Sequence, residues 1–106
     1  MPEAVIEWSR VAAERIPGAQ GVAEVRVRQV GQVRVRLVDY GPGYLADHWC
    51  SKGHVIHLIA GTLEIEHEDG TPAVRLASGM SWYVADGEGS AHRVRSQMGA
   101  RVFIVD

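Results

Sequence analysis

The sequence has little cysteine, no long apolar run and no marked excess of charge. A single cysteine in 106 residues excludes an internal disulfide framework, so nothing in the chain requires an oxidising compartment. No stretch approaches the ~20 apolar residues that span a bilayer, and the first ten residues lack the apolar core of a signal peptide. A formal net charge of −2 argues against binding to the phosphates of nucleic acid. We therefore expect a cytoplasmic protein that binds neither nucleic acid nor membrane.

What remains is the composition of one ordinary globular domain. The chain is 46% apolar and 23% charged, which excludes disordered and fibrous classes. Its length suits one core that needs no disulfide or other cross-link.

Short segments with apolar residues on one or both faces fill most of the chain. Val22–Val30 and Val33–Val38 alternate between valine or leucine and arginine. Five further runs complete the set: His54–Ala60, Thr62–Glu68, Met80–Val84, His92–Arg95 and Arg101–Val105. Many short runs separated by turn residues predict an antiparallel sandwich or barrel. One helix is predicted, over Ala4–Ile16, ended by Pro17-Gly18.

Four arginines occupy the polar positions of the first two runs. Arg26, Arg28, Arg34 and Arg36 are expected to form one basic face across neighbouring strands. A solvated sheet surface is the main interpretation of this face, and an anion-binding site is the alternative.

Side chains that bind metals gather in one segment. His48 and Cys50 are two residues apart and share a face of a predicted strand. His54 follows after a turn-forming Ser51–Gly53, and His92 begins a later strand. Three imidazoles and a thiolate suit a borderline or soft divalent metal. Taken singly, each of these four residues also has a purely structural explanation: Cys50 as a buried thiol, and each histidine as a surface residue.

Two other histidines are placed outside this group. His57 is out of phase with His54 on its strand, so we expect it to face the other side of the sheet. His67 lies among Glu64, Glu66 and Glu68, and we expect it in solvent.

Taken together, Gly41–Ser96 resembles the two motifs of the cupin superfamily. The first family motif has Gly, His-x-His, Glu and Gly, and the chain has Gly43, His48-Trp49-Cys50, His54 and Gly61. Cys50 thus stands in the place of the second His and His54 in that of the Glu. The second family motif has Gly, Pro-x-Gly, His and Asn, and the chain has Gly79, Ala85-Asp86-Gly87, His92 and Ser96. Here the turn is two residues longer, and the Pro and Asn are absent.

The segment Ala46–His54 looks specifically like a small group described as DHCW-motif cupin-fold proteins, to which no reaction is assigned. The resemblance implies an all-β double-stranded β-helix, or jelly-roll barrel. It implies one domain over 1–106, with an N-terminal extension over 1–21 and the barrel over 22–106. It also implies that one divalent transition metal is held by four inward-pointing residues: His48, Cys50, His54 and His92. Zinc is the first expectation, and iron and nickel are the alternatives.

Two functions remain open at this point. A metal with an open position would make the protein a metalloenzyme, an oxygenase or isomerase acting on a small polar molecule, with Tyr44, Trp82, Tyr83 or His57 along the approach. A closed four-coordinate metal would make it a non-catalytic metal or small-ligand binding protein or sensor, or would only stabilise the barrel. We also expect a homodimer, because Val5, Ile6, Trp8 and Val11 have no place in a barrel and would cover a partner's sheet edge.

Overall fold

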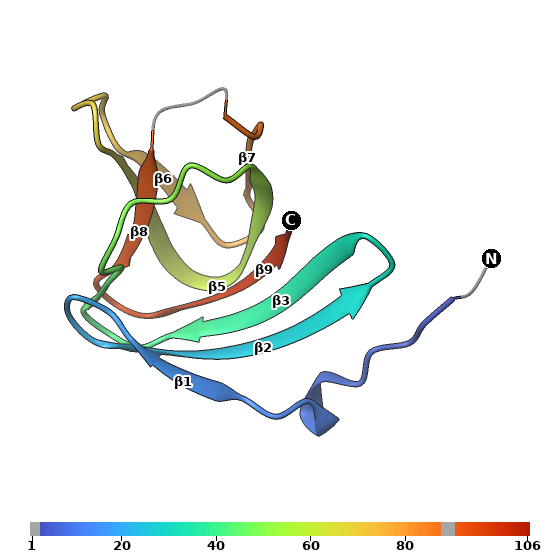
Figure 1. Ribbon diagram of the computed structural model, residues 1–106. Helices are drawn as coiled ribbons and strands as arrows, with labels where there is room; N and C mark the ends of the chain where they lie inside the picture. The colour runs from blue at the N-terminus through green and yellow to red at the C-terminus, as the bar shows by residue number, and fades with distance from the viewer. Residues whose placement is uncertain (1–2, 88–90) are drawn as a thin grey trace.

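The chain folds into two antiparallel sheets that share one strand (Figure 1). The structure is a computed structural model that describes residues 3–87 and 91–106. In these residues it has a short 3-10 helix, η1 (Trp8–Arg10), and nine strands. The strands are β1 (Glu14–Pro17), β2 (Val22–Val30), β3 (Val33–Tyr40), β4 (Tyr44–Leu45), β5 (His54–His67), β6 (Val74–Ala77), β7 (Ser81–Val84), β8 (His92–Ser96) and β9 (Ala100–Val105).

The shared strand is β5, which bends at Gly61. Its first half pairs with β9 and β7, and its second half pairs with β8 and β6. One sheet therefore runs β1-β2-β3-β9-β5-β7 and the other β4-β8-β5-β6. Gly61 has φ +89°, and a Cβ there would collide with the carbonyl oxygen of Gly99, so the bend requires glycine. The two strands predicted over His54–Ala60 and Thr62–Glu68 are thus one bent strand.

The core lies between the two sheets. Ile56 and Leu58 point into it before the bend, and Leu63 and Ile65 point into it afterwards. Even-numbered residues of β5 face the core before the bend, and odd-numbered residues face it afterwards. The change results from a bulge between Leu58 and Ala60 and from the bend that follows. Facing strands complete the core with Ala23, Val38, Leu76, Val94, Ala100, Val102 and Ile104.

The N-terminal segment differs from the prediction. The helix expected over Ala4–Ile16 is wrong: within residues 3–87 only the single turn of η1 forms, and β1 pairs with β2 from Glu14 onward. Tertiary contacts override helix propensity here: Glu14–Pro17 pairs with β2, and Val11 and Trp8 before it pack against the sheet. None of the helices in the described part of the chain has the length and apolar character needed to cross a bilayer.

The same segment covers the outer face of its own sheet. The Trp8 ring packs edge-on against Phe103 of β9, with 6.3 Å between ring centroids. Val11 is buried, and its carbonyl accepts a hydrogen bond of 3.1 Å from Nε of Arg26. Trp8 and Val11, which we expected to pack against a partner chain, thus pack against their own sheet.

The arginines do not form one basic face, so that prediction is wrong. The register sets Arg26 opposite Leu37 and Val27 opposite Arg36. Residues directly opposite each other in an antiparallel pair share a face. Arg26 and Arg28 therefore lie on the outer side, whereas Arg34 and Arg36 lie on the inner side.

Candidate functional site

Two histidines meet inside the barrel. His54 begins β5 and His92 begins β8, and both side chains are buried. Their Nε2 atoms are 2.9 Å apart, and the rings are nearly perpendicular at 82°. Two ligands of a tetrahedral zinc, each about 2.0–2.1 Å from the metal, lie about 3.3 Å apart. The two nitrogens need to separate by only a few tenths of an ångström to bind one metal. The histidine pair therefore fits a divalent transition metal such as zinc.

Backbone contacts hold the two histidines in place. The N–H of Gly53 donates to Oδ1 of Asp86 at 2.6 Å, and a Cβ on Gly53 would collide with the Asp86 backbone. Glycine therefore lets the loop before His54 lie directly against the loop after β7. Cys50 and His92 exchange two backbone hydrogen bonds of 2.8 and 2.9 Å. The Trp82 ring packs beside both imidazoles, with centroid distances of 6.0 and 4.9 Å.

All four predicted ligands line one hollow of about 250 Å³. Cys50 is half-buried on its wall. His48 lies at the rim with 82% of its side chain exposed, and its Nδ1 is 2.6 Å from Oδ1 of Asp47. Among the described residues, no three His, Cys, Asp or Glu side chains are assembled into a metal-binding group. The structure thus brings His54 and His92 into contact and places His48 and Cys50 on the same wall.

The environment of His54 keeps its ring neutral. Burial, together with the nearby His92 ring and the charge of Arg36, lowers the pKa of His54 to about 4. A neutral imidazole has a free lone pair and is the form that binds metals.

Two phenols form another part of the wall. The rings of Tyr40 and Tyr44 lie 4.6 Å apart between centroids, and both line the hollow. Burial raises the pKa of both phenols, so each keeps its proton at neutral pH. Of the residues expected along the approach, Tyr44 lines the hollow, whereas Trp82 packs against the two imidazoles.

The other two residues expected along the approach face away from it. Nδ1 of His57 is 2.7 Å from Oγ of Ser81, and His57 lies opposite Phe103 on the outer face. This confirms that His57 faces the other side from His54. Tyr83 pairs with Val55 on the same outer face and is 68% exposed.

His67 is not the solvated residue that was predicted. It is half-buried, its Nδ1 is shielded from solvent, and it lies directly opposite His92 in the pairing of β5 with β8. Its spacing of two and four residues from Ile65 and Leu63 places it in the interior phase of the strand. That alternation is present in the sequence, but the three neighbouring glutamates led to the prediction of a solvent-exposed histidine.

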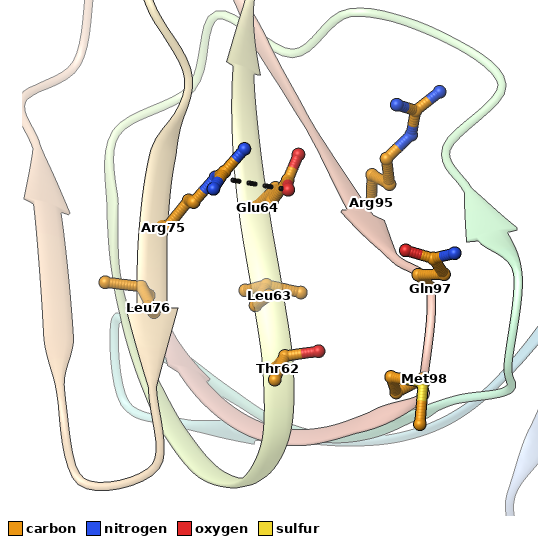
Figure 2. A pocket seen from close by; sticks show the side chains of 8 residues that line it. All are labelled: Thr62, Leu63, Glu64, Arg75, Leu76, Arg95, Gln97 and Met98. Carbon is orange, nitrogen blue, oxygen red and sulfur yellow. Dashed lines mark ion pairs between the residues drawn. The ribbon is translucent and has the colours of Figure 1, made fainter.

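A second hollow, of about 330 Å³, lies between β6, β5 and the end of β8 (Figure 2). Figure 2 shows Arg75 reaching toward Glu64, with which it forms an ion pair of 3.4 Å. Its other lining residues are Thr62, Leu63, Leu76, Arg95, Gln97 and Met98. This lining has no histidine or cysteine, and its one carboxylate, Glu64, is paired with Arg75. The candidate site is therefore the hollow that contains the histidine pair.

Comparison with known proteins identifies the fold. No protein-family model and no curated protein sequence matches the chain. Among solved structures, the chain is similar to a predicted oxalate decarboxylase from Thermotoga maritima, with a TM-score of 0.79, 14% identity and 96% of each chain covered. It is also similar to ectoine synthase from P. lautus, with a TM-score of 0.76, 17% identity, and coverage of 97% of this chain and 76% of that one.

A third similar structure carries the name of the fold. It is an RmlC-like cupin from Shewanella frigidimarina, with a TM-score of 0.74, 16% identity, and coverage of 98% of this chain and 89% of that one. The architecture is therefore the cupin β-barrel, which confirms the fold class predicted from the sequence.

Proposed function

We propose that the protein binds one divalent transition metal at His54 and His92 and uses it on a small polar molecule in the adjoining hollow. The observation that carries this proposal is the convergence of two buried Nε2 atoms, 2.9 Å apart, on the wall of that hollow. Zinc is the metal we expect first, and iron and nickel are alternatives that accept the same donors.

His48 and Cys50 are the proposed additional ligands. The carboxylate of Asp47 holds Nδ1 of His48 and so leaves Nε2 as the atom that would bind metal. A turn of this exposed ring toward the hollow would bring it to the histidine pair. The segment Asp47-His48-Trp49-Cys50 also supports membership of the DHCW-motif group, although its last two residues stand in the reverse order.

We favour catalysis by an oxygenase or isomerase type of reaction. A bound metal would supply Lewis-acid or redox chemistry to an oxygen atom of the substrate. The phenols of Tyr40 and Tyr44 would offer hydroxyl donors from the wall, and Trp82 would exclude water from behind the imidazoles. Two of the similar structures bear enzyme names, which supports an enzyme by analogy of fold.

A non-catalytic metal-binding or sensor protein is the second candidate. The half-buried Cys50, joined by backbone hydrogen bonds to His92, favours it. Three imidazoles and this thiolate would saturate a tetrahedral zinc and leave no position for substrate.

Metal analysis of protein made without added metal tests the proposal. We expect one metal ion per chain in the parent and less than about a tenth of that in His54→Ala and His92→Ala. His57→Ala is the matched control, because this histidine lies on the outer face of the same strand as His54. One metal ion per chain in both interior variants would overturn the proposal. X-ray absorption at the metal edge separates the two candidates, because an additional oxygen ligand from water favours catalysis.

A further inference from the structure

Arg36 lies on the interior face of the barrel. On β3 it is opposite Val27 of β2 and Ile104 of β9, and Ile104 is buried in the core. The Arg36 side chain is 23% exposed and lines the hollow that holds His54 and His92. A guanidinium group carries five N–H donors and accepts none, so it needs several acceptors in such a place.

Asp106 accepts only one of the hydrogen bonds that Arg36 can donate. Its carboxylate is 1% exposed and is bound from two sides by Arg34, through Nε at 3.1 Å and Nη2 at 2.6 Å. Arg36 reaches the same carboxylate through Nη2 alone, at 3.2 Å. Nε of Arg36 is buried and meets no hydrogen-bond acceptor within residues 3–87 and 91–106. A buried donor without a partner is destabilising, so this N–H would gain from a ligand that brings an acceptor.

The charges near this N–H are positive in sum. Burial alone would raise the pKa of Asp106, but the contacts with Arg34 and Arg36 and the charge of Lys52 outweigh it and hold the pKa below its usual value. Asp106 therefore carries one negative charge against the two positive charges of the arginines, before Lys52 is added. Two other charged side chains lie on the wall. Arg93 forms an ion pair with Glu66, and Asp47 is hydrogen-bonded to His48 and is 58% exposed, so that water screens much of its charge.

We propose that the hollow binds a small organic carboxylate, with one oxygen on the Nε–H of Arg36 and the remainder of the molecule facing His54 and His92. The planar guanidinium matches a carboxylate in geometry as well as in charge. The hollow of about 250 Å³ is somewhat smaller than the usual range of about 300–1,000 Å³ for ligand pockets, which suits a small ligand. That the remainder of the ligand faces His54 and His92 rests on the proposed function, whereas the contact with Arg36 needs no metal.

Titration of metal-free protein with acetate tests the contact directly. The probe is the ¹⁵N–¹H resonance of Nε of Arg36, followed at constant pH and ionic strength. We expect a saturable shift with acetate and none with acetamide, which has the same shape without the charge. Arg36→Lys keeps the charge and loses the planar group, and we expect its acetate affinity to fall at least about tenfold.

Arg28→Lys is the matched control, because Arg28 lies on the outer face of the neighbouring strand. We expect it to bind acetate as the parent does. No saturable shift of the Arg36 resonance, or equal shifts with acetamide, would overturn the proposal, and so would inorganic phosphate binding more tightly than acetate. Repeating the titration with zinc separates the two proposals. Tighter acetate binding in the presence of zinc supports a ligand that reaches from Arg36 to the metal. Unchanged binding contradicts that orientation and leaves the contact with Arg36 standing.

Discussion

Cys50 has two possible roles at the metal site, and they predict different spectra. As a ligand, its thiolate bonds to the metal directly. As a neutral thiol, it only borders a three-histidine site with open positions. We predict that the cobalt(II)-substituted protein shows an intense near-ultraviolet band from thiolate-to-metal charge transfer, because a thiol beside a metal ionises readily.

In Cys50→Ser this band should vanish and cobalt affinity should fall, while the fold stays intact because Ser is nearly the same size. His57→Ala serves as the control and should keep the band. A parent protein that binds cobalt without the band would show that Cys50 is not a ligand, and the open three-histidine site would then be favoured.

His54 should make the metal-free protein less stable as the pH falls. Its pKa is about 4 in the folded chain and about 6.5 in the unfolded one. Between these values the unfolded chain binds a proton that the folded chain does not, so the free energy of unfolding decreases on acidification. The loss should be on the order of 2 kcal/mol by pH 4.

Urea unfolding between pH 7.5 and pH 4 measures this loss. His54→Gln cannot take up the proton, so its stability should vary less with pH than that of the parent. Identical pH profiles in the two proteins would show that His54 does not titrate in this range.

Which residues line the hollow was only partly predictable from the sequence. The pairing of His54 with His92 follows from their resemblance to motif positions, and the outward direction of His57 follows from simple alternation. Arg36 was missed because its direction depends on the register between β2 and β3, which alternation within one strand does not determine. The exposed position of His48 depends on its bond with Asp47, a local contact that spacing does not reveal.

At the scale of the element, the bend of β5 depends on Gly61. We predict that Gly61→Ala destabilises the protein by about 3 kcal/mol or more, because the new Cβ meets both a positive φ and the Gly99 carbonyl. Gly70→Ala is the matched control. Gly70 has nearly the same φ, +85°, but a Cβ there meets nothing within 4 Å.

The control should lose only about 1 kcal/mol, the backbone cost of a positive φ. The midpoints of urea unfolding measure both values. Equal losses in the two variants would show that the close approach at Gly61 does not constrain the strand.

The bounds of several strands were predicted closely, whereas β5, the longest, was predicted as two strands. β2 has the predicted bounds, and β8 and β9 differ from prediction by one residue at one end. The two-residue β4 and the four-residue β6 were not predicted. β4 has too few residues to show alternation, whereas β7, which is as short as β6, was predicted to within one residue. The N-terminal helix was wrong because contacts outside the segment, the pairing of β1 with β2 and the packing of Trp8 on Phe103, determine the conformation there.

At the scale of the whole molecule, we predict a homodimer. β1 and β7 are the two outer strands of the larger sheet, and Val5 and Ile59 are exposed, at 97% and 44%. Edge strands with free backbone groups and exposed apolar side chains favour self-association. Light scattering at micromolar concentration should give twice the chain mass of 11.6 kDa. A mass of one chain that persists up to about 100 μM would contradict the prediction.

The position of β5 between both sheets also bears on how fast the chain folds. Its partners β6, β7, β8 and β9 all follow it in the sequence, and β3 pairs with β9 by joining Val35 to Val105. β1–β2, β2–β3 and β5–β6 join consecutive strands, but the other pairings close longer loops before they gain contacts. Topologies rich in such distant pairings fold slowly, in about milliseconds to seconds. The histidine pair joins the start of β5 to β8, so it assembles only after the chain through His92 has been synthesised. A ribosome-bound chain that ends before His92 would pair β5 only with β6 and β7 and would expose the edge that later pairs with β8 and β9. The nascent protein would then depend on chaperones to avoid aggregation through this edge.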